Sequence, residues 1–295
     1  MIQFINVNKN YDDKHVLEDI SFKIEEGSIV GLVGRNGSGK STILRLLAGV
    51  LDADAGIVAI NEESVFDNPN IKKEVFFVSD DLYFLTKSTI KDMMQFYQLF
   101  YPKFDLNLYY ELLKVFGFNE SQAISSFSKG MKRQVALILG ISARTKILLL
   151  DEAFDGLDPF MRFKVRQLIS DSSSSNKTIT IISSHNLSEL SEICDSILMI
   201  DEKKLHSHYN ENTYASLYHR FRLAFKDVMD ASVFDSLNPL HINGNQRIFT
   251  LVIKGDREEI IQKLQALEPI LLENDTLTLD EIFIYEMEAH NERPM

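Results

Sequence analysis

Short apolar runs alternate with helix-length segments along the first part of the chain. SIVGLVG at 28–34, KILLLD at 146–151 and TITIISS at 178–184 are apolar at most positions. Segments with helical spacing of apolar residues follow the first two runs, at 42–51 and 161–169. Strands that are apolar on both faces are typical of a parallel sheet covered by helices. The pattern therefore predicts an α/β fold with a mixed, largely parallel sheet.

The pattern changes in two places. Between about 86 and 140 the chain becomes mostly helical, which indicates a helical lobe inserted between strands of the sheet. After about residue 205, β-rich runs such as RIFTLVIK and the helical segment REEIIQKLQAL indicate a small α/β appendage. We therefore expect a main domain at 1–205 and an accessory domain at 206–295.

Composition and charge narrow the function classes. The chain has 295 residues, 45% of them hydrophobic, which is enough for one large domain or two ordinary ones. A formal charge of −12 argues against broad, non-specific binding to nucleic acid or to an anionic membrane. Cys194 is the one cysteine, so no internal disulfide can form, and the first residues lack the zones of a secretory signal. Since no apolar run approaches the ~20 residues of a membrane helix, we expect a cytosolic protein.

The strongest motif is GRNGSGKST at 34–42, between a predicted strand and a predicted helix. It fits the pattern G-x-x-x-x-G-K-[ST], in which glycines let backbone amides converge on phosphate oxygens. In this pattern Lys40 reaches the β and γ phosphates and Ser41 ligates Mg²⁺. The alternative, a glycine-rich turn without a ligand, is disfavoured by the strand and helix on either side. We predict a nucleoside triphosphate site made of Gly34, Arg35, Asn36, Gly37, Ser38, Gly39, Lys40, Ser41 and Thr42.

A second predicted strand, ILLLDE at 147–152, ends in two acidic residues. Asp151 would hold the water shell of Mg²⁺, and Glu152 would polarise the water that attacks the γ-phosphate. Apolar strands often end in acidic residues, so this run alone is weak evidence. It gains weight from the phosphate-binding motif, because ligand sites of α/β sheets collect at the carboxyl ends of strands.

The order of these motifs resembles the ATPase subunit of an ABC transporter, over about residues 1–205. FSKGMKRQ at 127–134 matches the family signature Leu-Ser-Gly-Gly-Gln, with its first, third and fifth residues replaced. The resemblance implies that Ser128 and Gly130, at the head of a helix, bind the γ-phosphate of a nucleotide held by another subunit. Without the resemblance, the segment would be interpreted simply as a helix N-cap.

Three further residues fit the same family. Tyr11 matches the aromatic residue that stacks on adenine, and Asp158, in DGLD at 155–158, lies in a segment that resembles the loop crossing the dimer interface. His185, after the strand TITIISS, resembles the histidine that contacts the γ-phosphate. Taken alone, the tyrosine is more often a core or strand-surface residue, and a single histidine after a strand usually has no special role.

The segment VFFVSDDLYF at 75–84 departs from the family. Where the family has a glutamine that contacts Mg²⁺ or water and forms the hinge of the helical lobe, this chain has Asp80, or Asp81 if the register shifts by one. An ionised aspartate only accepts hydrogen bonds and adds negative charge near Asp151 and Glu152. We predict that Asp80 helps to bind Mg²⁺ and that the like charges favour an open site without nucleotide. The alternative is a solvated turn.

The resemblance implies a head-to-tail homo- or heterodimer that binds two ATP molecules with Mg²⁺ and closes when they bind. Glu152 and His185 are then the catalytic residues. A separate multi-span permease would hold the protein at the inner face of the cell membrane, and no nucleic acid partner is expected. The alternatives are an ABC ATPase that acts on the ribosome or nucleic acid without a permease, and a catalytically weak nucleotide switch.

The end of the chain bears on the direction of transport. LDEIFIYEME at 279–288 resembles the C-terminal extensions of bacterial exporter ATPases. We therefore expect export of an amphipathic peptide, a toxin or an antimicrobial compound. Residues 206–295 could equally stabilise or regulate the dimer, and the two interpretations are compatible.

Overall fold

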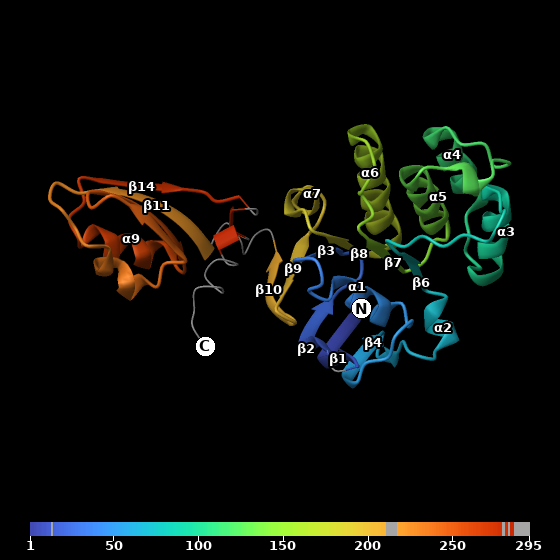
Figure 1. Ribbon diagram of the computed structural model, residues 1–295, viewed down its shortest axis with the longest axis horizontal. Coiled ribbons are helices and arrows are strands. Elements are labelled where there is room, and N and C mark those ends of the chain that lie inside the picture. The colour runs from blue at the N-terminus through green and yellow to red at the C-terminus, as the bar shows by residue number, and fades with distance from the viewer. Residues whose placement is uncertain (13, 211–216, 279–280, 283, 286–295) are drawn as a thin grey trace. The chain divides into compact units, whose positions relative to one another are not determined.

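The chain forms two compact units, Met1–His208 and Tyr209–Met295. Each unit has its own hydrophobic core. None of the helices in the described part of the chain is long and apolar enough to cross a membrane. The computed structural model describes residues 1–12, 14–210, 217–278, 281–282 and 284–285 (Figure 1).

The main sheet of the first unit consists of β3 (Ile29–Val33), β6 (Val75–Val78), β7 (Ile147–Asp151), β8 (Ile179–Ser184), β9 (Ser196–Asp201) and β10 (Lys204–Asn210). The strand order is β10-β9-β3-β8-β7-β6, and the pairs from β9 to β6 are parallel. The register places Asp151 opposite Ser183, and Val33 opposite Ser184. Because parallel strands end at the same edge, the segments after β3, β6, β7 and β8 all begin at one edge of the sheet.

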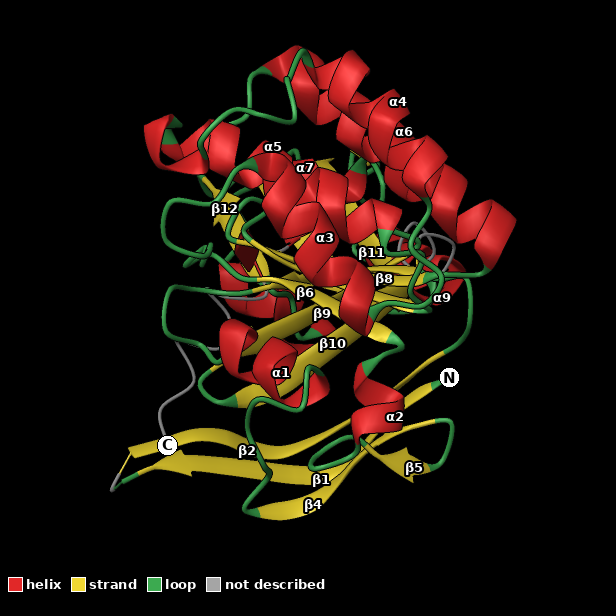
Figure 2. Cartoon of the chain, turned by 90° about the vertical axis from the view of Figure 1, so that its right-hand side faces the viewer, coloured by secondary structure: helices red, strands yellow, loops and turns green. Residues whose placement is uncertain are grey.

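A second, antiparallel sheet covers one side of the first unit. It consists of β1 (Ile2–Tyr11), β2 (Lys14–Ile24), β4 (Ala55–Ile60) and β5 (Glu63–Ser64), in the order β2-β1-β4-β5. Helix α1 (Lys40–Leu47) lies between the two sheets and contacts β4, β7 and β8 (Figure 2). Ile43, Leu44 and Leu47 are wholly buried there, which explains why this helix is apolar on most of its surface. The short helix α2 (Pro69–Lys72) precedes β6.

The other side of the main sheet is covered by helices (Figure 1). These are α3 (Ile90–Phe100), α4 (Leu106–Phe116), α5 (Lys129–Ser142), α6 (Pro159–Asn176) and α7 (Leu187–Ser191), with a 3₁₀ turn at Ile124–Ser126. Thr89 begins α3 with a capping box that includes Asp92, and the Asp105 side chain caps α4. Helix α5 contacts both α3 and α4 and also packs on β6, so it connects α3 and α4 to the sheet.

The second unit is a four-stranded antiparallel sheet with helices on one face. Its elements are β11 (Tyr218–Ala224), a 3₁₀ helix (Ala231–Leu237), β12 (His241–Gly244), β13 (Ile248–Lys254), α9 (Arg257–Gln265) and β14 (Leu271–Asp275). The strand order is β12-β13-β11-β14. Phe234 and Leu264 from the helices pack against Phe221, Phe249 and Leu251 of the central strands, and all five are buried.

The predicted α/β class with a mixed sheet is confirmed. The segment at 279–288, from which export was expected, lies partly outside the described residues. Within it the structure describes Glu281, Ile282, Ile284 and Tyr285. Ile282 is buried and Glu281 forms an ion pair with Arg220 of β11, so these two residues belong to the second unit.

Candidate functional site

The glycine-rich segment forms the tight connection between β3 and α1. Gly37 and Gly39 have φ angles of 82° and 111°, in the left-handed region that favours glycine. At Gly34 a Cβ atom would lie 2.1 Å from the carbonyl oxygen of Ile200, so only glycine fits there. The loop therefore depends on glycine at its first position for space and at the other two for backbone conformation.

Lys40, the first residue of α1, points back into this loop. Its Nζ atom donates to the carbonyl oxygens of Gly34 at 2.8 Å and Arg35 at 3.2 Å, and it lies 3.9 Å from Glu152 Oε1. Burial lowers the pKa of Lys40, and the nearby charges of Glu152 and Asp151 oppose that shift. The lysine is thus a buried cation at the mouth of a loop that can bind phosphate.

Ser183 joins the two acidic residues at the end of β7, Asp151 within the strand and Glu152 directly after it. Its hydroxyl donates to Asp151 Oδ1 at 2.5 Å and accepts from the backbone N–H of Glu152 at 3.0 Å. Asp151 is buried, with 2% of its surface exposed. This serine was not among the predicted site residues, although a polar residue at the end of an apolar strand beside β7 was a usable signal.

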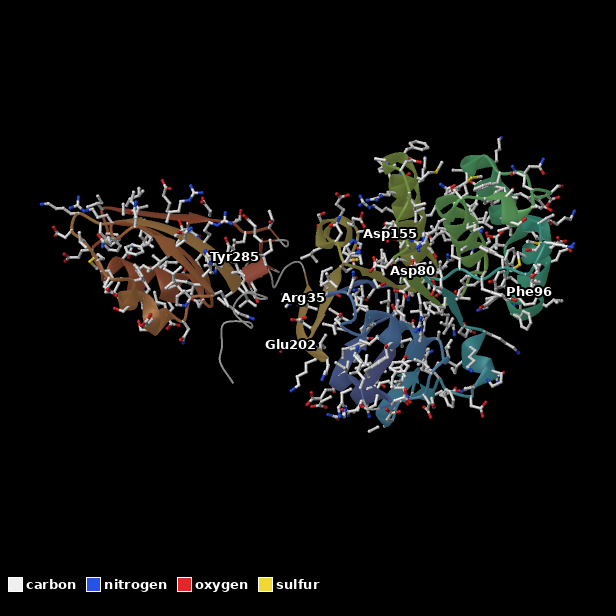
Figure 3. All side chains as sticks on the ribbon, viewed as in Figure 1. Arg35, Asp80, Phe96, Asp155, Glu202 and Tyr285 are labelled. Atoms are coloured by element: carbon white, nitrogen blue, oxygen red, sulfur yellow. The ribbon has the colours of Figure 1, made fainter. Side chains whose placement is uncertain are left out.

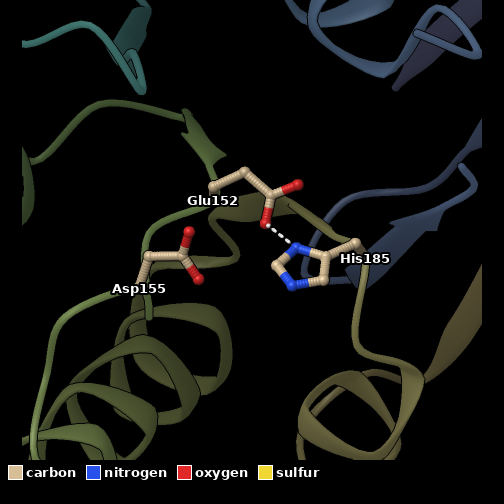
Figure 4. Close-up of side chains that lie close together, drawn as sticks. All are labelled: Glu152, Asp155 and His185. Atoms are coloured by element: carbon tan, nitrogen blue, oxygen red, sulfur yellow. Dashed lines mark hydrogen bonds and ion pairs between the residues drawn. The ribbon is translucent and has the colours of Figure 1, made fainter. Parts of the chain in front are cut away.

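Glu152 is held between His185 and Lys40. Its Oε2 atom lies 3.0 Å from His185 Nδ1, as Figure 4 shows. Burial raises the pKa of Glu152, while the hydrogen bond with His185 and the charge of Lys40 act in the opposite direction. A carboxylate with a raised pKa beside a phosphate-binding loop is suited to accept a proton near neutral pH.

Two groups of side chains could hold a metal ion. Asp151 and Ser41 offer a carboxylate and a hydroxyl, the hard oxygen ligands that suit Mg²⁺, next to the phosphate-binding loop. Ser38 Oγ is buried without a partner among the described residues, as expected of a loop built for a polar ligand. Within the described residues, Glu152, Asp155 and His185 also offer ligand atoms that all lie within 4.8 Å of one another (Figure 4).

Asp80 faces helix α5. Its Oδ1 atom accepts from Arg133 Nη2 at 2.5 Å and from Lys129 Nζ at 3.1 Å, whereas the neighbouring Asp81 is exposed. Partial burial would raise the pKa of Asp80, but the hydrogen bonds and charges of Lys129 and Arg133 outweigh it and lower the pKa. The expected repulsion between Asp80 and the other carboxylates is therefore offset by two cations. Its predicted role as a metal ligand stays a prediction.

The residues predicted to face a second subunit lie at helix starts, and the tyrosine predicted to stack on adenine lies at a strand end. Ser128 caps α5 by accepting from Met131 N–H at 3.2 Å. Asp158 caps α6 in the same way. A Cβ at Gly130 would lie 2.5 Å from the carbonyl oxygen of Gly156, so the start of α5 packs closely on the loop before α6. Tyr11 ends β1 and is 38% exposed.

Arg133 is, after Ser183, a second residue of this region that the sequence did not reveal. It lies within FSKGMKRQ, yet its side chain is wholly buried and donates to the carbonyl oxygens of Glu152 and Asp155. Figure 3 labels Asp80 and Asp155, the two acidic residues between which Arg133 lies. The sequence shows an arginine one helical turn into α5 but not the direction in which it points.

Comparisons with known proteins agree with this geometry. A family model described as "ABC transporter" matches residues 17–155. The chain is 30% identical over 284 residues to the ABC transporter ATP-binding protein YtrB of Bacillus subtilis, covering 96% of this chain and 97% of that protein. It is 32% identical over 223 residues to the methionine import ATP-binding protein MetN of Clostridium tetani, covering 72% and 69%.

Solved structures of low sequence identity share the fold. The ATP-binding subunit of an ABC transporter superposes with a TM-score of 0.67 at 22% identity and covers 72% of this chain and 91% of its own. CbiO1 of Clostridium perfringens, described as part of the ABC transporter complex cbiONQ, superposes with a TM-score of 0.59 at 21% identity, covering 71% and 88%.

Proposed function

Since the chain belongs to the ABC transporter family and is one of its ATP-binding subunits, an ATPase, we propose that it hydrolyses Mg²⁺-ATP to drive a separate membrane permease. The resemblance drawn from the sequence motifs is thereby confirmed at the level of the family. The observation that carries the proposal is the position of Glu152, with its carboxylate between His185 and Lys40 beside the phosphate-binding loop.

Nucleotide binding is assigned to the loop at 34–39 and the first turn of α1. The backbone amides of the loop and the N-terminus of α1 favour phosphate, and Lys40 adds a positive charge. Ser41 and Asp151 would hold Mg²⁺, whose charge offsets that of the phosphates. Lys40 Nζ would exchange its bonds to the carbonyls of Gly34 and Arg35 for bonds to phosphate oxygens.

Hydrolysis is assigned to Glu152 and His185. A water molecule attacks the γ-phosphorus in line with the bond to ADP, and the Glu152 carboxylate accepts the proton that this water loses. Its raised pKa makes it a better proton acceptor than an ordinary exposed glutamate. His185 orients Glu152 through its hydrogen bond and is placed to contact the γ-phosphate as well.

A head-to-tail dimer, homo- or heteromeric, would complete each site. In this arrangement Ser128 and Gly130 of one subunit approach the nucleotide held by the other, Asp158 lies at the interface and Tyr11 contacts adenine. One feature supports it: Ser128 and Gly130 lie at the N-terminus of α5, where backbone N–H groups favour a phosphate. The permease would hold this dimer at the inner face of the cell membrane.

Export of an amphipathic peptide, a toxin or an antimicrobial compound is our proposal for the direction of transport. The support is confined to the second unit. It is the resemblance of the segment at 279–288 to the C-terminal extensions of bacterial exporter ATPases. Tyr209–Met295 could also stabilise or regulate the dimer, as expected from the sequence.

One experiment tests the transport role. The tagged protein is purified from detergent-solubilised membranes, and its partners are identified with and without ATP. We expect a multi-span membrane protein that stimulates ATP hydrolysis. Recovery with ribosomes or nucleic acid, and without such a protein, would overturn the proposal. Inside-out vesicles that contain the complex then distinguish export, seen as ATP-dependent accumulation of labelled peptide, from import.

A further inference from the structure

The Arg133 side chain is completely buried and connects three separate segments of the first unit. Its Nη1 atom donates to the carbonyl oxygens of Glu152 at 2.5 Å and Asp155 at 3.1 Å. Its Nη2 atom donates to Asp80 Oδ1 at 2.5 Å. One guanidinium group therefore joins helix α5 to the segment after β6 and to the loop after β7.

The contact with the loop after β7 fixes the backbone of the proposed catalytic base. Glu152 has a φ angle of 49°, in the left-handed region that is uncommon for a non-glycine residue. Its N–H donates to the carbonyl and hydroxyl oxygens of Ser183, and its carbonyl oxygen accepts from Arg133. The Glu152 residue is thus held on both sides, which sets the direction of its side chain.

The contact with Asp80 balances the charge of Arg133. A buried guanidinium without a counter-ion is unfavourable, and its Nε atom has no partner among the described residues. Asp80 is the acidic side chain at hydrogen-bond distance, while Asp155 Oδ2 lies 4.0 Å from Nη1. Since Lys129 also binds Asp80, the carboxylate is oriented toward α5 from two directions. Asp80 and Arg133 are therefore complementary in charge and geometry.

We propose that Arg133 is a positioning residue for Glu152, and that Asp80 acts as its counter-ion, so that the two function as a pair. The inference rests on the proposed role of Glu152. It gives Asp80 a function other than binding Mg²⁺, and the two functions predict different kinetics. A counter-ion of Arg133 affects the rate of hydrolysis, whereas a metal ligand affects the concentration of Mg²⁺ that the enzyme requires.

The test compares wild type with Asp80→Asn, Arg133→Gln and the double variant. For each, kcat, KM for ATP and the Mg²⁺ concentration at half-maximal rate are measured. We expect each single variant to lower kcat by about 10- to 100-fold, because small misplacement of a catalytic group has effects of this size. KM and the Mg²⁺ requirement should change by less than about threefold. Loss of a substrate or metal ligand would instead raise one of these two quantities. The double variant should be no slower than the slower single variant.

Several results would overturn the proposal. Single effects that multiply in the double variant would show that Asp80 and Arg133 act independently. A raised Mg²⁺ requirement in Asp80→Asn with an unchanged kcat would assign the carboxylate to the metal. If Arg133→Gln does not fold, Arg133→Lys replaces it, since lysine keeps the charge but lacks the forked donors. A kcat of Arg133→Lys equal to wild type would then contradict the proposal.

Two controls make the outcome specific. The first is Arg144→Gln, because Arg144 also bonds an aspartate, Asp105, but lies before β7, at the opposite edge of the sheet. The kcat of this variant should stay within about twofold of the wild-type value. Glu152→Gln should lower kcat by about 10²- to 10⁴-fold. If Glu152→Gln stays active, the proposed function has failed; if it is inactive and the Asp80 and Arg133 effects are uncoupled, only the present inference has failed.

Discussion

Lys40 Nζ lies 3.9 Å from Glu152 Oε1, so the lysine proposed to bind phosphate and the proposed catalytic base face each other across the ends of β3 and β7. Lys40 also binds two carbonyl oxygens of its own loop. A phosphate bound by Lys40, as proposed, would replace these contacts.

Lys40→Ala should weaken ATP binding by about 10- to 100-fold, the effect of losing one charge-assisted hydrogen bond. Binding is measured by titration with a fluorescent ATP analogue in the presence of Mg²⁺. The control is Lys91→Ala. It removes an exposed lysine of α3 that is paired with Glu120, and it should leave the affinity for ATP unchanged. Equal affinity of Lys40→Ala and wild type would rule out phosphate binding by this lysine.

Glu152→Gln should lower kcat by about 10²- to 10⁴-fold, the usual contribution of a general base, while ATP still binds. Glutamine keeps the shape of the side chain but cannot accept the proton. Phosphate release measures the rate, and equilibrium titration measures the affinity. The matched control is Glu120→Gln, which changes the glutamate that pairs with Lys91 of α3 and should leave activity near the wild-type value. Retention of hydrolysis in Glu152→Gln would place the base elsewhere.

The pH dependence of kcat should have an acid limb above the ordinary range of a glutamate. Burial raises the pKa of Glu152, and the protonated carboxyl cannot accept a proton, so activity falls as pH decreases through that raised pKa. His185 lowers this pKa through its hydrogen bond, and Asp155 raises it through its charge.

Two substitutions should therefore move the acid limb in opposite directions. His185→Ala removes a contact that favours the carboxylate, so the limb moves to higher pH. Asp155→Asn removes a negative charge that favours the protonated form, so the limb moves to lower pH. Profiles of kcat against pH, each scaled to its own maximum, separate these shifts from changes in the maximal rate. Shifts of the same sign would contradict the described electrostatics.

Phe234→Ala should destabilise the second unit by about 3–5 kcal/mol, the usual effect of truncating a buried phenylalanine. Its side chain is wholly buried and packs on Phe249, with 5.0 Å between ring centroids. Scanning calorimetry should show one unfolding transition shifted to lower temperature and the other, from Met1–His208, little changed. Val228→Ala, at a site 59% exposed in the same unit, is the control. A single transition that shifts as a whole would show that the units unfold together.

The parts of the site that lie in continuous motifs could be predicted from the sequence. A strand, a glycine-rich turn and a helix identify the residues around Lys40, and two of the glycines, Gly37 and Gly39, are required by local backbone geometry. The strand that ends at Asp151 is similarly evident, because four consecutive apolar residues, all buried, precede the aspartate.

The contacts between distant segments could not be predicted. Asp80 and Arg133 are separated by 53 positions, and their pairing depends on which face of α5 packs on β6. From the sequence, a role for Asp80 follows only from the glutamine that it replaces, and its bond to Arg133 is not visible. The backbone of Glu152 is likewise bonded to distant residues, Ser183 and Arg133, which lie 31 and 19 positions away. Neither feature has a local sequence signal.

The hydrogen bonds of Ser183 have a consequence for insertions and deletions. Asp151 and Ser183 are opposite one another in neighbouring strands, and Glu152 and His185 follow them by one and two positions. The separation of the proposed base from its histidine is therefore determined by strand alignment rather than by the lengths of surface loops. Loops elsewhere in the chain can change length without disturbing this pair, whereas one residue added to or removed from β7 or β8 would shift the alignment and separate them.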